Sequence, residues 1–259
     1  MRYKGIIFDV NHTLVGISQE SEVQEYAVGV LFREIRKHSH LSFSEGEFRR
    51  AYAEAWNSAK RGSYESLREV RYEAVVGQTV GKFGLTFSAD EMEHILQRYM
   101  EPLYQASFVI PGMRELMLAL RPRFRLGALT NYKYSSGIRT MLAKLKLDDL
   151  VDVLVVSSEV GWKKPAPKIY NEMVQQLEVA PTECISVGNE LEKDLWQARK
   201  LGMATILFEP REIGLFVDTE VASILRERIG AQELKCDYIA RSVPELAGIL
   251  TQINDMQPT

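Results

Sequence analysis

After Pro111, short apolar segments alternate with amphipathic helical patterns, and this alternation restricts the chain to few folds. The sequence predicts buried strands over residues 124–129, 151–156, 184–187, 204–208 and 237–240. It predicts helices around residues 113–120, 169–177, 191–195, 222–228 and 244–253. Because parallel strands are joined by right-handed helical crossovers, this order indicates an α/β fold with a Rossmann-like, doubly wound parallel sheet.

Before Pro111 the pattern differs, because only the apolar run Ile6–Phe8 has the character of a buried strand. The segment that follows shows three apolar stripes at helical spacing. They comprise Tyr26, Val30, Leu31 and Ile35; Phe48, Tyr52, Ala55 and Trp56; and Met92, Ile95, Leu96 and Tyr99. We expect these stripes, aromatic residues included, to form the core of an all-helical cap over residues 16–105. The α/β core then comprises residues 1–15 and 106–259.

The formal charge of −3 and the mixed charge signs argue against a nucleic-acid-binding surface, which needs a clustered basic face. The longest aliphatic stretch, Val151–Val156, is far shorter than the roughly 20 residues that cross a bilayer, so we expect no membrane span. Secretion is not indicated, and the two cysteines, Cys184 and Cys236, suit a reducing cytoplasm. We expect a small-molecule substrate, while the choice between monomer and homodimer stays open.

Polar side chains stand at or just beyond the ends of four predicted strands. They are Asp9, Asn11 and Thr13; Thr130 and Asn131; Lys164; and Asn189 and Asp194. In open α/β sheets the carboxyl ends of the strands face the crevice where ligands bind. Asp9, delivered to that edge by an apolar strand, is therefore a candidate nucleophile.

These four motifs and the inserted cap make the chain resemble the haloacid dehalogenase superfamily of hydrolases over essentially its whole length. The motifs read FDVNHTL, LTNY, KKPAPKIY and VGNELEKD. The resemblance implies that Asp9 attacks phosphorus to form an aspartyl phosphate. It also implies that Thr130 and Asn131 bind phosphoryl oxygens while Lys164 supplies positive charge. Thr13 is assigned to substrate binding.

The resemblance also implies a Mg²⁺ ion held by oxygen ligands. These would be Asp9, the main-chain carbonyl of Asn11, Asn189 and the nearby Asp194. Asn11 and Asn189 both stand where the family usually has aspartate, so we expect weakened metal binding and no general acid at position 11. Each asparagine also has an ordinary alternative: Asn189 as a helix N-cap and Asn11 as a turn residue.

Three functions remain open. The leading prediction is a magnesium-dependent phosphatase of a small phosphorylated metabolite that acts through Asp9. A metal-independent 2-haloacid dehalogenase is the second, because a halide leaves without a proton, and Tyr170 resembles an aromatic position of that branch. No cap arginine can be identified for a substrate carboxylate. The third is a catalytically reduced member that binds a ligand or a protein.

Three further regions carry open interpretations. Arg61 and Tyr64 lie in a polar break, residues 60–64, which we expect to separate two cap helices. Both are candidate substrate contacts, although a solvated loop explains them too. Lys163, beside Lys164, is expected to be a solvated neighbour. The segment Glu209–Gln232 is either an insertion beside the site or a contact surface.

Overall fold

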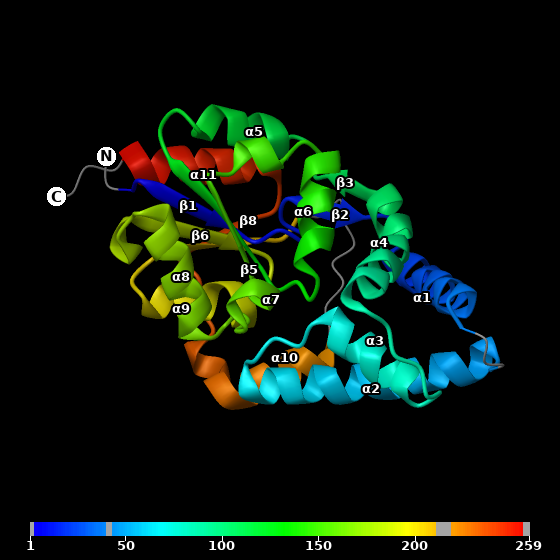
Figure 1. The fold of residues 1–259 in the computed structure, drawn as a ribbon. Coiled ribbons are helices and arrows are strands. Elements are labelled where there is room, and N and C mark those ends of the chain that lie inside the picture. The colour runs from blue at the N-terminus through cyan, green and yellow to red at the C-terminus, as the bar shows by residue number, and fades with distance from the viewer. Residues whose placement is uncertain (1–2, 40–42, 211–218, 256–259) are drawn as a thin grey trace.

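The computed structural model of the chain describes residues 3–39, 43–210 and 219–255, and a parallel sheet forms its core (Figure 1). The strands are β1 Gly5–Phe8, β4 Arg125–Thr130, β5 Val153–Val156, β6 Cys184–Gly188, β7 Ala204–Phe208 and β8 Tyr238–Ala240. They lie in the order β5-β4-β1-β6-β7-β8, and all five pairings are parallel. The predicted α/β fold and each of its predicted strands are confirmed.

Helices cover both faces of this sheet, which explains why its strands are apolar throughout. The core helices are α5 Met113–Leu120, α6 Ser135–Lys144, α7 Ser157–Val160, α8 Pro167–Leu177, α9 Trp196–Lys200 and α11 Val243–Asp255. On β1, Ile6 and Phe8 join the hydrophobic core that includes α5, α6 and α11, whereas Ile7 joins the core of α8 and α9. This alternation fixes which residues reach the strand ends.

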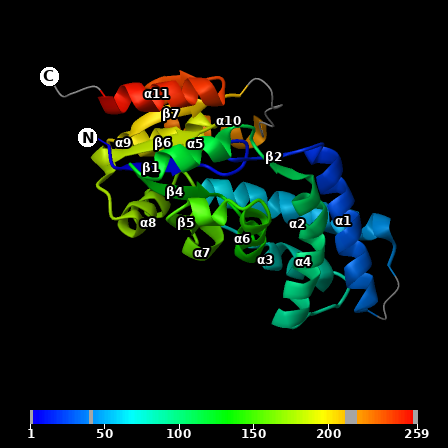
Figure 2. The same ribbon diagram turned by 90° about the horizontal axis from the view of Figure 1, so that it is seen from above.

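The cap consists of four helices beside the sheet: α1 Glu20–Lys37, α2 Glu45–Ser66, α3 Tyr72–Gly81 and α4 Ala89–Ala106. Figure 2 shows α1 and α4 packed side by side. Ser44 and Ser88 begin α2 and α4 with capping boxes, the second of which the sequence suggests directly. The first stripe is partly wrong, because Tyr26 is 60% exposed while Leu31 and Ile35 are buried.

The chain enters and leaves the cap through a two-stranded antiparallel ribbon rather than through helices. Strand β2, Val15–Ile17, pairs with β3, Ser107–Val109. The expectation of an all-helical cap over residues 16–105 is therefore wrong at its start, where Gly16 and Ile17 belong to β2. Strands of three residues are too short to show a clear alternation of apolar and polar positions.

The predicted polar break over residues 60–64 is also wrong, because α2 continues through it to Ser66. Helix α2 packs against another helix, α10 Thr219–Ile229. Glu220 on α10 accepts hydrogen bonds from Lys60 at 3.0 Å and from Arg61 at 3.3 Å. The segment Glu209–Gln232 thus contributes a contact surface for the cap, although its residues 211–218 lie outside the described residues.

The link between α2 and α3 is fastened to the core. Arg68 forms an antiparallel bridge to Trp162, and its guanidinium lies 3.9 Å from the centre of the Trp162 ring. The Glu69 carboxylate accepts a hydrogen bond from Ser157 at 2.6 Å and lies 3.3 Å from Lys163 Nζ. These contacts hold one side of the cap next to the loop that carries Lys164.

Within the described part of the chain, none of the helices is long and apolar enough to cross a membrane.

Candidate active site

Asp9 lies at the carboxyl end of the central strand, between two neighbouring strands that also carry polar residues. Phe8 of β1 is in register with Ala128 of β4 and Val187 of β6. The Asp9 amide extends this register by donating to the Val187 carbonyl at 2.9 Å. The sheet therefore brings the first, second and fourth sequence motifs to one edge, as predicted.

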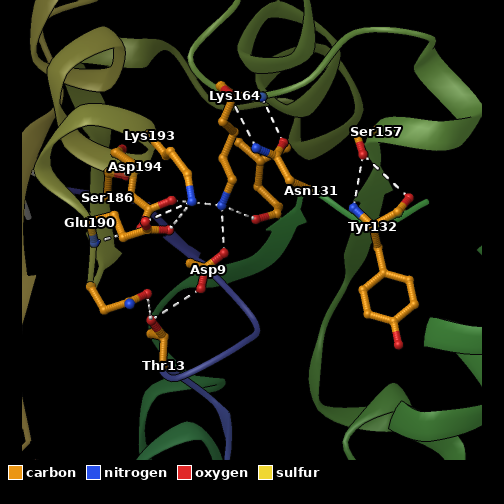
Figure 3. A network of polar contacts seen from close by, with 12 residues as sticks. Asp9, Thr13, Asn131, Tyr132, Ser157, Lys164, Ser186, Glu190, Lys193 and Asp194 are labelled. Carbon is orange, nitrogen blue, oxygen red and sulfur yellow. Dashed lines mark hydrogen bonds and ion pairs between the residues drawn. The ribbon is translucent and has the colours of Figure 1, made fainter. Parts of the chain in front are cut away.

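Lys164 joins these motifs through its ammonium group (Figure 3). Its Nζ donates to Asp9 Oδ1 at 2.5 Å, to Asp194 Oδ1 at 2.7 Å and to the Leu129 carbonyl at 2.9 Å. Although burial alone would lower the pKa of Lys164, the two carboxylates raise it above its usual value. The lysine is therefore a permanently charged group held against the candidate nucleophile.

The other oxygen of Asp9 faces the fourth motif. Thr13 Oγ1 lies 3.3 Å from Asp9 Oδ2 and 3.5 Å from Asn189 Oδ1, so the hydroxyl bridges the two side chains. Burial is the largest influence on Asp9 and raises its pKa to about 6, against the opposing charge of Lys164. At neutral pH the carboxylate is therefore ionised, with Lys164 and Thr13 as its side-chain partners.

Thr130 and Asn131 end β4 but point in different directions. Thr130 Oγ1 is buried and has no hydrogen-bond partner among the residues that the structure describes. The Asn131 side chain turns to the Lys164 main chain: its Oδ1 accepts from the amide at 2.7 Å, and its Nδ2 donates to the carbonyl at 3.1 Å. Both polar atoms of this side chain therefore position Lys164, and its contact with phosphoryl oxygens stays a prediction.

In the fourth motif, the side chain of Asp194 packs against Gly188 at the end of β6. A side chain at Gly188 would place its Cβ only 2.4 Å from the Cβ of Asp194, so this close approach requires glycine. Asp194 Oδ2 accepts from the Glu190 amide at 2.9 Å, and its Oδ1 binds Lys164. The N-cap alternative for Asn189 is wrong, because the π-helical turn Leu191–Leu195 begins after Glu190 and has no side-chain cap.

Three oxygen donors of the first and fourth motifs are candidates for holding a cation. Asp9 and Asn189 supply side-chain oxygens that both contact Thr13, and Asn11 supplies its main-chain carbonyl. Within residues 3–39, 43–210 and 219–255, no three His, Cys, Asp or Glu side chains form a metal-binding group. One carboxylate with neutral oxygens fits a Mg²⁺ ion that keeps most of its waters. Asp194 contributes less directly, since both its oxygens are already engaged.

A cavity of about 510 Å³ opens beside this site between core and cap. Its walls include Asn11 and Tyr132 from the core and the aromatic side chains of Tyr52, Trp56 and Tyr72 from the cap. Phe48, earlier in the same stripe, is fully buried as expected. The stripe thus serves the cap core at one end and the cavity wall at the other, where the sequence predicts core alone.

Asn11 is one of the residues that line the cavity. In the described part of the chain, its side-chain Oδ1 is buried and lacks a hydrogen-bond partner. The turn interpretation of Asn11 is therefore wrong, since it needs that oxygen to accept from the main chain two residues ahead. The Thr13 amide bonds instead to the Val10 carbonyl at 3.3 Å.

Three predicted substrate contacts lie elsewhere. Arg61 is exposed on α2, where it pairs with Glu220. Tyr64 is buried under Lys163, whose Nζ lies 3.8 Å from the centre of its ring. Tyr170 is fully buried, and its hydroxyl lies 2.6 Å from the Lys193 carbonyl and 3.0 Å from the Asp194 carbonyl. Tyr170 therefore contacts the main chain of the fourth motif and does not line the cavity.

Sequence reasoning missed two charged groups around the site. Lys163 is fully buried rather than solvated, because Tyr64 and Glu69 from the cap enclose it. His12 has a left-handed backbone conformation, φ 61°, and its Nε2 lies 3.2 Å from Glu20 Oε2 at the start of α1. Burial works against protonation of His12, but Glu20 raises its pKa overall. The sequence spacing of these pairs carries no signal for such contacts.

Comparison with known proteins agrees with this arrangement. The family profile of the haloacid dehalogenase-like hydrolases matches residues 3–202. The chain belongs to this family of hydrolases, and the predicted membership is confirmed. A glyceraldehyde 3-phosphate phosphatase of Pyrococcus furiosus is 28% identical over 148 residues, which cover 56% of this chain and 55% of that protein.

A ribulose-1,5-bisphosphate 5-phosphatase of Halopiger xanaduensis is also 28% identical, over 44% of this chain and 48% of that protein. The chain thus spans about half the length of the curated relatives it matches. A crystal structure of a HAD phosphatase from Thermococcus onnurineus matches with a TM-score of 0.64 and 24% identity, covering 95% of this chain and 97% of that one. A 2-haloacid dehalogenase from Pseudomonas syringae matches with a TM-score of 0.66 and 16% identity, covering 97% of this chain and 99% of that one. These two likenesses show the fold alone.

Proposed function

We propose that the chain is a phosphomonoester hydrolase that forms an aspartyl phosphate on Asp9. The observation that carries this proposal is the Asp9 carboxylate, which Lys164 holds at 2.5 Å at the end of β1. The neighbouring strand β4 ends at the Thr130 hydroxyl, which is buried without a partner among the described residues. A nucleophile, a fixed cation and an unused hydroxyl at one sheet edge suit the transfer of a phosphoryl group.

The chemistry follows from these residues. Asp9 attacks phosphorus, while the Lys164 ammonium offsets the charge on the nucleophile and the transferring oxygens. Thr130 donates its hydroxyl to a phosphoryl oxygen. Asn131 holds the Lys164 main chain in place and acts as a positioning residue. Water then attacks the aspartyl phosphate, which releases inorganic phosphate and restores Asp9.

A Mg²⁺ ion would be held by Asp9, the carbonyl of Asn11 and Asn189, and would stabilise the charge of the transferring phosphoryl group. The number of carboxylates among these donors is small, so we expect weak binding. Thr13 contacts both side-chain donors and keeps them together. The phosphatase names of the relatives from Pyrococcus and Halopiger support a small phosphorylated metabolite as substrate.

A dehalogenase needs a cation for the substrate carboxylate, and the cavity wall does include Arg49. This guanidinium is already paired with Glu45, at 2.8 Å between Arg49 Nη2 and Glu45 Oε1, and also bonds the Glu25 carbonyl. The phosphatase therefore remains the better supported function.

The test is a screen of phosphate esters with 5'-nucleotides, sugar phosphates and aryl phosphates, run with Mg²⁺ and with EDTA. We expect phosphate release that requires Mg²⁺ and that Asp9→Asn reduces to background. Asp149→Asn, the same change at an exposed position, is the matched control and should behave as the unaltered chain. Release that survives Asp9→Asn would overturn the proposal, as would chloride release from 2-chloroacids in EDTA with no phosphatase activity.

A further inference from the structure

The wall of the cavity beside Asn11 is a row of aromatic rings. Tyr52 and Trp56 lie one turn apart on α2 with ring centres 6.1 Å apart and planes inclined by 21°. The row continues to Tyr72 on α3, whose ring centre is 5.5 Å from that of Trp56 at an inclination of 25°. All three residues line the cavity. They form the aromatic wall, a series of rings that suits contact with another aromatic ring, offset-stacked or edge-on.

The two tyrosine hydroxyls of this wall are turned toward Tyr99. The Tyr52 and Tyr99 hydroxyls lie 3.5 Å apart, and the Tyr99 hydroxyl donates to the Tyr72 hydroxyl at 3.4 Å. Burial raises the pKa values of Tyr52 and Tyr72 well above their usual range, so both hydroxyls stay neutral. The two tyrosines of the wall therefore offer ring surface to a bound ligand, since their hydroxyls already contact Tyr99.

Asn11 restricts the kind of bond that the site can break. It lines the same cavity and stands two residues after the nucleophile, but an amide has no acidic proton for a leaving oxygen. The nearby carboxylate of Glu20 is engaged by Gln24 at 2.9 Å and by His12 at 3.2 Å. An aliphatic alkoxide is about as basic as hydroxide, whose conjugate acid has a pKa of about 15.7. The conjugate acid of a phenolate has a pKa of about 10, so a phenolate leaves far more readily without a proton.

We propose that the site acts on aryl phosphates, monoesters of a phenolic hydroxyl, whose ring rests on the aromatic wall of Tyr52, Trp56 and Tyr72. This inference rests on the proposed function of Asp9 as the nucleophile. The Lys133 ammonium, 4.8 Å from the centre of the Trp56 ring, adds positive charge to the wall, which favours an anionic leaving group.

The proposed reaction has two steps. An Asp9 oxygen forms a bond to phosphorus while the bond between phosphorus and the aryl oxygen breaks. The phenolate leaves with the electron pair of that bond and takes a proton from solvent. Water then attacks the phosphorus of the aspartyl phosphate, and the Asp9 carboxylate leaves, so the products are a phenol and inorganic phosphate.

The first test compares kcat/KM for substituted phenyl phosphates and for glycerol 3-phosphate in the unaltered chain and in Asn11→Asp. This constant reports the phosphoryl-transfer step and excludes the later attack of water on the intermediate. In the unaltered chain, we expect kcat/KM for phenyl phosphates to exceed that for glycerol 3-phosphate by at least about 100-fold. Asn11→Asp should raise kcat/KM for the aliphatic ester by about 10²- to 10⁴-fold. It should raise kcat/KM for 4-nitrophenyl phosphate by less than about tenfold.

The second test addresses the wall. Trp56→Ala should raise KM for phenyl phosphate about two- to tenfold and leave KM for glycerol 3-phosphate unchanged, whereas Trp56→Phe should restore binding. Trp196→Ala, the same change away from the cavity, is the control.

Separate outcomes overturn the two proposals. If no ester is hydrolysed in a manner that depends on Asp9, both fail. If Asp9-dependent hydrolysis favours glycerol 3-phosphate, or if Asn11→Asp raises both ester classes equally, only the inference of an aryl substrate fails. Equal effects of Trp56→Ala on both esters would also overturn it.

Discussion

Asn131 clamps the main chain of Lys164 from both sides, with Oδ1 accepting from the Lys164 amide and Nδ2 donating to the Lys164 carbonyl. The two residues belong to different motifs, 33 positions apart, on the loops after β4 and β5. The clamp fixes the start of a long flexible side chain whose ammonium must meet Asp9. Positioning of this kind contributes to catalysis because small displacements of reacting groups are costly.

Removal of the clamp should therefore slow the reaction. We expect Asn131→Ala to lower kcat by about 10- to 100-fold, because the main chain that carries the Lys164 side chain is no longer held in place. KM should change little. Steady-state kinetics on the best ester from the screen measure both constants. Asn171→Ala, on the exposed face of α8, is the matched control. A large rise in KM at constant kcat would instead mean that the Asn131 amide contacts substrate.

Tyr170 provides a second prediction, because its hydroxyl faces two main-chain carbonyls of the fourth motif. Tyr170→Phe leaves these buried acceptors without their donor, so the free energy of unfolding should fall by about 1–3 kcal/mol. KM should stay unchanged. Chemical denaturation and steady-state kinetics test the two parts, with Tyr26→Phe on the exposed face of α1 as control. A raised KM with unchanged stability would restore the role in substrate binding that the sequence suggests.

The sheet and its edge were predictable because each strand carries its own signal. Ile6–Phe8 is apolar throughout, since both faces of the sheet are covered, and the polar residue that follows marks the strand end. Parallel strands then bring these ends together whatever the details of the loops. Asp9 could be placed at this edge for that reason, whereas the role of Lys164, eight residues beyond β5, came from the family resemblance.

Side-chain directions at that edge were not predictable. Whether Asn131 faces a ligand or the Lys164 main chain depends on the conformation of two loops, which sequence spacing does not encode. Gly62 and Ser63 suggest a break in α2 because both have modest helix propensity, but tertiary contacts override propensity here. One such contact pairs Arg61 with Glu220, 159 residues further along the chain.

Lys163 is the clearest case of a residue whose surroundings come from distant segments. It is fully buried, with Glu69 Oε1 3.3 Å from its Nζ and the Tyr64 ring beneath it. Burial lowers the pKa of Lys163 from its usual 10.5 to about 7, and the charges of Lys133 and Lys193 act in the same direction against that of Glu69. The folded chain thus releases this proton at a lower pH than the unfolded chain does.

This difference predicts a distinct pH dependence of stability. Between pH 7 and pH 10.5 the unfolded chain binds more protons at Lys163 than the folded chain, so its contribution to the free energy of unfolding rises with pH. Below pH 7 both states bind the proton and the contribution is constant. Relative to Lys163→Met, the unaltered chain should therefore gain stability from pH 7 to pH 9, by at most about 1.4 kcal/mol per pH unit. Urea denaturation at pH 7, 8 and 9 measures the difference, with Lys168→Met at an exposed position as control. Parallel pH profiles of the unaltered chain and Lys163→Met would show that Lys163 keeps its proton in the fold, held by Glu69.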